Sequence, residues 1–185
     1  MKGYVQIYTG TGKGKTTAAL GLAVRAVGAG LRVYICQFMK SGDYSEIKAL
    51  KRLSECLAES PALDGAITGA ITIEQFGTGR FVRGKPAEKE FEAGRQGLAR
   101  LREALISGDF DVVIAEEANV AVSCGIFSAE ALCDLIDIKP PDMELVITGR
   151  GAAESLINRA DLVTDMRAVK HYFENGVAAR TGIEK

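Results

Sequence analysis

Short apolar runs alternate along the chain with longer segments in which hydrophobic residues recur at helical spacing. Several runs, such as 112–115 and 145–147, are apolar at every position, which is typical of strands covered on both faces. The runs expected to be strands are Tyr4 to Tyr8, Arg32 to Phe38, Ile71 to Gln75, Asp111 to Ala115, Glu144 to Thr148 and, more weakly, Leu162 to Met166. The segments expected to be helices are Lys15 to Ala29, Tyr44 to Glu59, Ala87 to Ser107, Ser128 to Ile138 and Ala152 to Arg159. This alternation predicts an α/β fold with a largely parallel sheet and helices on both faces.

Length and composition are those of one ordinary globular domain, and we expect residues 1–185 to form it. The chain has 185 residues, 47% of them hydrophobic, and its formal net charge of −1 provides no basic field for nucleic acid. The chain shows no secretory signal and no run long enough for a membrane helix, and its 4 cysteines form no C-x-x-C pair. We therefore expect a cytoplasmic protein with reduced thiols and no membrane or nucleic-acid partner.

Two segments lack a clear period. Residues 54–70 include Pro61 and Gly65, and we expect an extended connection there. The final segment, 167–185, is too short for a domain of its own, so we expect it to cover part of this one.

The residues after the first expected strand have the composition of a phosphate-binding loop. They are Gly10, Thr11, Gly12, Lys13, Gly14, Lys15, Thr16 and Thr17. Glycines let backbone N–H groups point at phosphate oxygens, the helix amino end adds partial positive charge, Lys15 neutralises a phosphate oxygen, and Thr16 can bind Mg²⁺. In the usual G-x-x-x-x-G-K-[ST] pattern the first glycine would replace Thr9, but here it is Gly10. The sequence thus predicts a nucleoside triphosphate held differently from the way in which kinases hold it.

Two acidic residues follow the fourth expected strand. Glu116 and Glu117 stand where a carboxylate can hold a metal ion or its water beside the phosphate loop. The alternative is a glutamate pair that caps the following turn in solvent. The residues after the first strand also have an alternative interpretation, a glycine-rich turn capped by a lysine. That interpretation does not explain why Gly-Lys-Thr-Thr stands at the start of a helix.

Together these motifs resemble the P-loop type of ATP:corrinoid adenosyltransferase, the cob(I)yrinic acid a,c-diamide adenosyltransferase family. Residues 9–19 are similar to the family's TGNGKGKTTAA loop, whose first glycine is shifted in the same way. Residues 116–119 resemble its DEIN motif, and residues 148–151 resemble its TGRG motif. Further similar segments are 25–28, 37–40 and the stretch from 160 to 183, so the resemblance covers nearly the whole chain.

The resemblance implies a single P-loop NTPase-like (RecA-like) domain that transfers the 5′-deoxyadenosyl group of ATP to the cobalt(I) of a reduced corrinoid and releases triphosphate. It implies that the loop holds the triphosphate in reverse, with ribose C5′ at the reaction centre. It also implies Mg²⁺ or Mn²⁺, a flavoprotein-type reductant and a homodimer. Because cobalt(I) is a strong nucleophile, the protein has to align the reactants, stabilise the leaving triphosphate and exclude water.

These considerations give the residues three sets of expected roles. Catalysis is assigned to Lys15, Thr16 and Glu117, and the metal to Thr16 and Glu116, although either glutamate could contact it. The nucleotide is assigned to Gly10, Thr11, Gly12, Lys13, Gly14, Lys15, Thr16, Thr17, Arg25 and Arg150.

Other residues have simpler explanations beside the functional one. Arg25 can contact triphosphate or simply interact with the helix dipole, and Arg150 can contact triphosphate or pair with a helix carboxylate. His171 is expected to pack or orient a neighbour, since transfer to cobalt needs no proton shuttle. Phe76 and Phe81 are expected in the core or in a lid.

The chain departs from the family pattern at three places. Glu116 replaces the usual aspartate, and Phe81 is offset from the aromatic residues with which some members displace the lower ligand of the corrinoid. The sequence opens almost directly on its first expected strand, so we expect no amino-terminal helix of the kind that covers a neighbouring subunit's site in some members. A P-loop kinase or NTPase, and an ATP-dependent switch or corrinoid chaperone, remain alternative functions.

Overall fold

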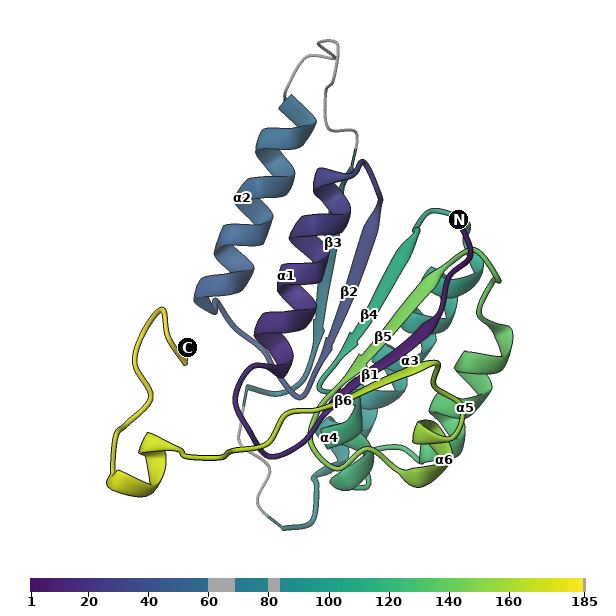
Figure 1. The fold of residues 1–185 in the computed structure, drawn as a ribbon. Coiled ribbons are helices and arrows are strands. Elements are labelled where there is room, and N and C mark those ends of the chain that lie inside the picture. The colour runs from purple at the N-terminus through teal and green to yellow at the C-terminus, as the bar shows by residue number, and fades with distance from the viewer. Residues whose placement is uncertain (60–68, 80–83, 185) are drawn as a thin grey trace.

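The computed structural model describes residues 1–59, 69–79 and 84–184, and in them it contains one six-stranded sheet (Figure 1). The strands are β1 (Val5–Thr9), β2 (Val33–Phe38), β3 (Ile71–Phe76), β4 (Val112–Glu116), β5 (Glu144–Thr148) and β6 (Leu162–Asp165). Their order across the sheet is β3-β2-β4-β5-β1-β6, and every neighbouring pair is parallel. The predicted parallel α/β sheet is confirmed, with strand ends within one residue of those expected.

Helices cover both faces of the sheet, as predicted (Figure 1). On one face lie α1 (Lys15–Gly28) and α2 (Ser45–Glu59), which pack Leu20, Val27 and Leu50 onto the sheet. The other face carries α3 (Glu88–Ile106), α4 (Ala118–Ser123), α5 (Ala129–Ile138) and α6 (Glu154–Ile157). No helix within the described ranges combines the length and the apolar character that crossing a bilayer requires.

Two helices differ from the sequence-based expectation. Helix α4 was not expected, because its six residues are too few to show a period, and Glu117 precedes it in a left-handed conformation with φ +58°. The helix expected from Ala152 to Arg159 is only the four-residue α6, anchored by the buried Leu156. Residues that precede α6 are extended, with Ala153 at ψ 146°, so the helix begins late.

The two segments without a clear period, 54–70 and 167–185, differ in how far the structure agrees with expectation. Residues 54–59 belong to α2 rather than to an extended connection, whereas 60–68 lie outside the described residues, as does Phe81. After β6 the chain runs outward as a largely exposed segment with one short 3₁₀ helix, Tyr172–Asn175, before its end returns towards the start of α2 (Figure 1).

Candidate nucleotide-binding site

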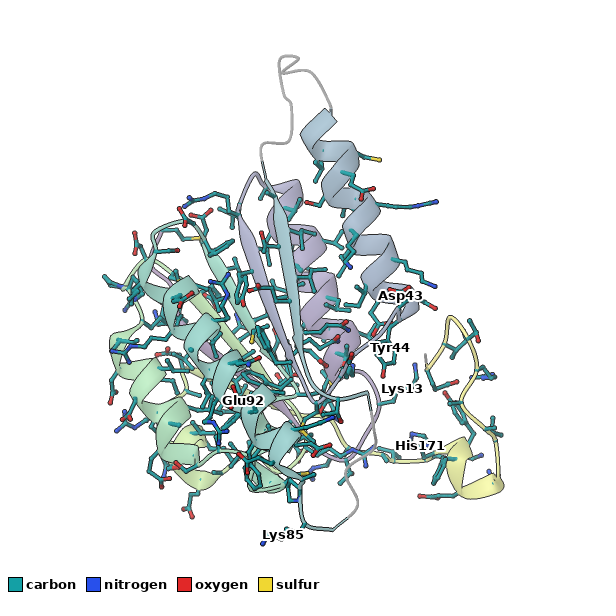
Figure 2. The ribbon with its side chains drawn as sticks, turned by 180° about the vertical axis from the view of Figure 1, so that it is seen from behind. Lys13, Asp43, Tyr44, Lys85, Glu92 and His171 are labelled. Atoms are coloured by element: carbon teal, nitrogen blue, oxygen red, sulfur yellow. The ribbon has the colours of Figure 1, made fainter. Side chains whose placement is uncertain are left out.

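A cleft of about 690 Å³ opens at the carboxyl edge of the sheet, in the size range of small-molecule sites. The sequence-predicted residues that line it are Gly12, Lys13, Gly14, Lys15, Thr16, Thr17, Glu117 and Arg150. Its other walls are Leu20, Lys40, the start of α2 at Ser45 and Glu46, and the C-terminal residues His171, Gly182, Ile183 and Glu184. Lys13 and His171, which border the cleft from opposite ends of the chain, are labelled in Figure 2.

The phosphate loop is packed closely against the end of β6. The Gly12 N–H donates to the Met166 carbonyl at 2.6 Å. Gly10 has φ +99°, and a Cβ there would lie 2.3 Å from Asp165 Oδ1, so only glycine fits. The shifted glycine therefore has a packing reason of its own: the chain after β6 passes directly against this part of the loop.

Lys15, the first residue of α1, is folded back onto the loop. Its Nζ donates to the carbonyls of Gly10 at 2.8 Å and Gly12 at 2.6 Å, and the residue is only 7% exposed. Burial is the main cause that lowers the pKa of Lys15, with Arg150 adding to it, while Glu117 opposes the shift. A desolvated cation with two weak neutral acceptors has much to gain from an anionic phosphate oxygen.

Thr16 contacts the acidic residue at the end of β4. The Thr16 hydroxyl Oγ1 donates to Glu116 Oε1 at 2.5 Å. Glu116 is 0% exposed, and its other oxygen, Oε2, accepts no hydrogen bond from the described residues. The neighbouring Gln37, opposite Glu116 on β2, has an equally unbonded buried Nε2. A buried carboxylate oxygen without a donor, beside a threonine hydroxyl, is chemically suited to a magnesium ion or to a water that it binds.

Glu117 faces the cleft itself, whereas Glu116 lies beneath it. The Glu117 backbone N–H donates to Thr148 Oγ1 at 2.9 Å, which helps to hold the residue's left-handed conformation. Burial, followed by the nearby Glu116 charge, raises the pKa of Glu117, while Lys40, Lys15 and Arg150 act in the opposite direction. The alternative of a solvent-exposed capping pair is wrong for Glu116, which is fully buried, whereas Glu117 does occupy the N-cap position of α4 but makes no side-chain cap hydrogen bond there.

No cluster of three or more His, Cys, Asp or Glu side chains suitable for a metal occurs in the part of the chain that the structure describes. Any ion here would have few protein ligands and would depend on phosphates and water for the rest. Magnesium is commonly bound in this way.

Of the remaining predicted residues, only Arg150 lines the cleft. Arg150 follows β5, is exposed at the cleft, and forms no ion pair with any described residue, so the expected alternative of a helix carboxylate partner finds no support. Arg25 lies ten residues along α1 from Lys15, about 15 Å at 1.5 Å per residue, and does not line the cleft. Thr11 is exposed outside the lining, and Gly10 lies beneath it.

Sequence reasoning gave no role to two parts of the cleft. Lys40 stands two residues after the end of β2, and since carboxyl ends of parallel strands share one edge, its position was a usable signal. The C-terminal wall was expected only in general terms, as a final segment 167–185 that covers part of the domain, without an indication of which part. His171 accepts the Phe173 N–H on Nδ1 at 3.1 Å and so begins the 3₁₀ helix.

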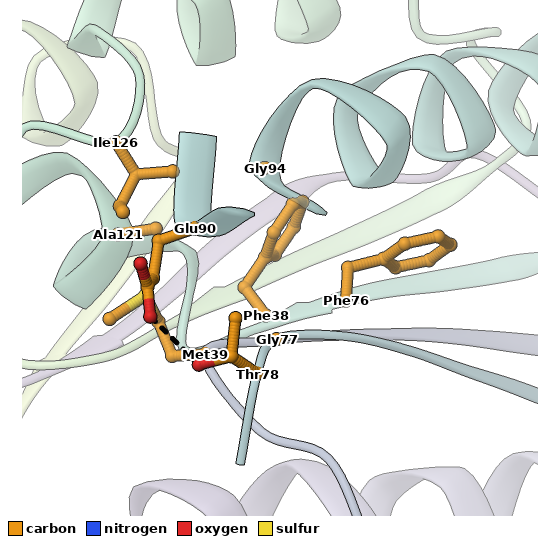
Figure 3. Close-up of a pocket in the computed structure, with 9 residues that line it drawn as sticks. All are labelled: Phe38, Met39, Phe76, Gly77, Thr78, Glu90, Gly94, Ala121 and Ile126. Atoms are coloured by element: carbon orange, nitrogen blue, oxygen red, sulfur yellow. Dashed lines mark hydrogen bonds between the residues drawn. The ribbon is translucent and has the colours of Figure 1, made fainter. Parts of the chain in front are cut away.

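A second, apolar pocket lies beside the ends of β2 and β3. Figure 3 shows Phe38, Met39 and Phe76 around it, with the Thr78 hydroxyl bonded to Glu90 at 2.8 Å. The pocket encloses about 10 Å³, enough for about one water molecule. Phe76 packs against the main core cluster here, as its sequence position suggested.

Comparison with known proteins identifies similar chains over nearly the full length. A family model described as "ATP:corrinoid adenosyltransferase BtuR/CobO/CobP" matches residues 1–184. A corrinoid adenosyltransferase of Escherichia coli (strain K12) is 30% identical over 183 residues, which cover 99% of this chain and 86% of that protein. One of Pseudomonas aeruginosa is 27% identical over 184 residues, with 99% and 84% covered. The corrinoid adenosyltransferase CobA of Salmonella typhimurium is 30% identical over 183 residues, with 99% and 86% covered.

Proposed function

The chain belongs to the ATP:corrinoid adenosyltransferase family, and from this premise we propose that it transfers the 5′-deoxyadenosyl group of ATP to the cobalt(I) of a reduced corrinoid, with the phosphate loop holding the triphosphate. The observation that carries the proposal is the cleft at the amino end of α1, where Lys13, Lys15 and Arg150 surround space for a polyphosphate.

The triphosphate lies over the loop and is the leaving group. Cobalt(I) attacks ribose C5′, a cobalt–carbon bond forms, the C5′–O bond breaks, and triphosphate departs with the electron pair of that bond. Lys15 and the loop N–H groups stabilise the charge that develops on the departing oxygen, with Lys13 and Arg150 at the rim. No side chain has to supply or remove a proton.

The nucleotide lies in the reverse of the direction found in kinases, with C5′ rather than the γ-phosphorus at the reaction centre. This part of the proposal follows from the family resemblance.

A divalent cation, Mg²⁺ or Mn²⁺, would be held by Thr16 and Glu116, and when bound it would neutralise triphosphate charge. Two observations support this assignment: the 2.5 Å contact between the two side chains, and the absence of any hydrogen-bond donor to Glu116 Oε2 among the described residues. Glu117, which faces the cleft, would orient the ion's water shell or exclude other anions.

The family resemblance further suggests a homodimer, a flavoprotein-type reductant and a cytoplasmic location, and the whole chain from 1 to 185 as one domain. Cobyrinic acid diamide, cobinamide and complete cobalamin are the candidate acceptors. They can be compared directly as substrates under one set of reducing conditions.

One assay tests the proposal against its alternatives. The protein is incubated with ATP, Mg²⁺ and chemically reduced corrinoid, and the phosphate product is identified. Triphosphate together with a light-sensitive cobalt–carbon product is the expected result. ADP with transferred or free phosphate would instead establish a kinase or NTPase, and unchanged ATP would establish a switch or chaperone.

A further inference from the structure

Lys40 is the charged neighbour of the buried Glu116 carboxylate. Its Nζ lies 3.4 Å from Oε2 and 3.5 Å from Oε1, and its side chain is 21% exposed whereas that of Glu116 is 0% exposed. The other groups around this carboxylate are Thr16, which bonds Oε1, and Gln37 opposite it on β2. Lys15 also contributes an electrostatic interaction with Glu116 from across the loop.

Lys40 Nζ donates one long hydrogen bond to Oε1 at 3.5 Å, and it is paired with Oε2 by charge alone, because Oε2 accepts no hydrogen bond from the described residues. The ammonium is therefore near the carboxylate and not locked onto it. Its outer side is in contact with the Tyr44 ring, with Nζ 5.5 Å from the ring centroid. Tyr44 immediately precedes α2 (Figure 2).

Lys40 also lines the same cleft as the phosphate loop. Its backbone is set by Met39, which has φ +62° and whose N–H donates to the Phe76 carbonyl at 3.0 Å. This turn at the end of β2 brings the lysine between the carboxylate beneath the cleft and the space above it. The side chain can thus reach either an acidic partner below or an anionic ligand within the cleft.

We propose that Lys40 exchanges partners during the reaction: it neutralises Glu116 until a divalent cation binds there, and it then contacts the triphosphate and stabilises its departure. The physical reason is competition between cations for one buried carboxylate. A divalent ion at Glu116 and Thr16 repels the nearby ammonium, and the triphosphate offers it a stronger anionic partner. The inference rests on the proposed function only in taking triphosphate as that anion.

The proposal predicts two changes of opposite sign in Lys40→Met, which keeps the side chain as far as Cε and removes the charged ammonium. Without nucleotide, Mn²⁺, followed by its paramagnetic resonance signal, should bind about 3- to 10-fold more tightly, because its competitor is gone. In the presence of Mg²⁺, inorganic triphosphate should bind about 10-fold more weakly by calorimetry, as expected for the loss of one charge-assisted contact. Lys40→Arg should restore both affinities to within about 3-fold of the wild type.

Lys13→Met is the matched control. Lys13 borders the cleft but forms no ion pair with any described residue, so its loss should weaken triphosphate and leave Mn²⁺ affinity without nucleotide unchanged. Circular dichroism establishes that each variant is folded. If Lys40→Met leaves Mn²⁺ affinity unchanged or weakens it, or leaves triphosphate affinity unchanged, the exchange of partners is wrong. Neither measurement involves a corrinoid, so failure of adenosyl transfer by the wild type would count against the proposed function alone.

Discussion

Thr16 and Glu116 are 100 positions apart in the sequence, yet the hydroxyl of one donates to the carboxylate of the other at 2.5 Å. The bond joins the first turn of α1 to the end of β4, because the sheet places β4 near the strand that leads into the phosphate loop. It brings together the two groups to which we assign the metal.

Replacing Thr16 with valine should weaken Mn²⁺ binding in the presence of ATP by about 10-fold or more. The variant keeps the side-chain shape but loses the proposed metal ligand. It leaves the buried Glu116 Oε1 with only the 3.5 Å contact from Lys40 among the described residues, which should lower the free energy of unfolding by about 1–3 kcal/mol. Mn²⁺ resonance titration and thermal unfolding measure the two effects. Thr72→Val, at an exposed position of β3, is the control for the substitution itself. Unchanged Mn²⁺ affinity in Thr16→Val would remove this residue from the metal site.

Lys15→Ala should lower the rate of adenosyl transfer by at least about 100-fold, comparable with the removal of one oxyanion donor. The loss of rate should exceed the loss of stability, because among the described residues the Lys15 ammonium bonds only the two loop carbonyls of Gly10 and Gly12. The measurements are single-turnover formation of the cobalt–carbon product and thermal unfolding of the same sample. Near-wild-type transfer would exclude Lys15 from the mechanism.

Glu117→Gln should stabilise the protein at pH 8 and not at pH 4. Burial and Glu116 raise the pKa of Glu117, so the folded protein retains this proton at a pH where the unfolded chain has lost it. Stability from this group is therefore complete below its ordinary pKa and falls as the pH rises towards the raised value. We expect the variant to gain about 2 °C in Tm at pH 8. A lower Tm than the wild type at pH 8 would mean that attraction to Lys40, Lys15 and Arg150 outweighs burial.

Arg150 and Arg25 should differ in their effect on triphosphate binding. Arg150 borders the cleft, and Arg25 lies about 15 Å along α1 from the loop, since each residue of a helix adds about 1.5 Å. By calorimetry, Arg150→Met should weaken the binding of inorganic triphosphate by about 10-fold, and Arg25→Met should weaken it by less than about 2-fold. Equal losses of triphosphate affinity in the two variants would show that residues at the far end of α1 also contribute to binding.

Gly10→Ala should both destabilise the protein and weaken its binding of ATP. The new methyl carbon would lie 2.3 Å from Asp165 Oδ1, and the alanine residue would also have to adopt φ +99°. A left-handed non-glycine residue costs of order 1–3 kcal/mol before the overlap is counted. Chemical denaturation and ATP titration measure the two effects. Gly21→Ala, in α1 with open space around the added methyl, should be neutral or stabilising.

The fold was largely accessible from the sequence because the strands are buried on both faces. Runs such as Val112–Glu116 show this burial directly as continuous apolar residues. Helix α4 could not be predicted in the same way: it is shorter than two turns and starts from a left-handed Glu117, a conformation set by tertiary contact with Thr148. Local propensity carries no information about such a contact.

The site was predicted as far as local sequence encodes it. Residues 10–17 form one motif, and its members from Gly12 to Thr17 line the cleft, whereas Gly10 and Thr11 do not. Segment 37–40 was identified, but Lys40 was given no role of its own, because its contact with Glu116 depends on β2 lying next to β4. The C-terminal wall depends on the path of an exposed segment over many residues, for which periodicity gives no signal.

The hydrogen bond from Gly12 to the Met166 carbonyl has a consequence for hybrid enzymes. The phosphate loop and the chain after β6 pack so closely at this point that a Cβ on Gly10 would overlap Asp165. In chimaeras built from two relatives, residues 9–15 and 165–167 should be exchanged together. Exchanging either segment alone would join a loop to a neighbour with which it does not fit.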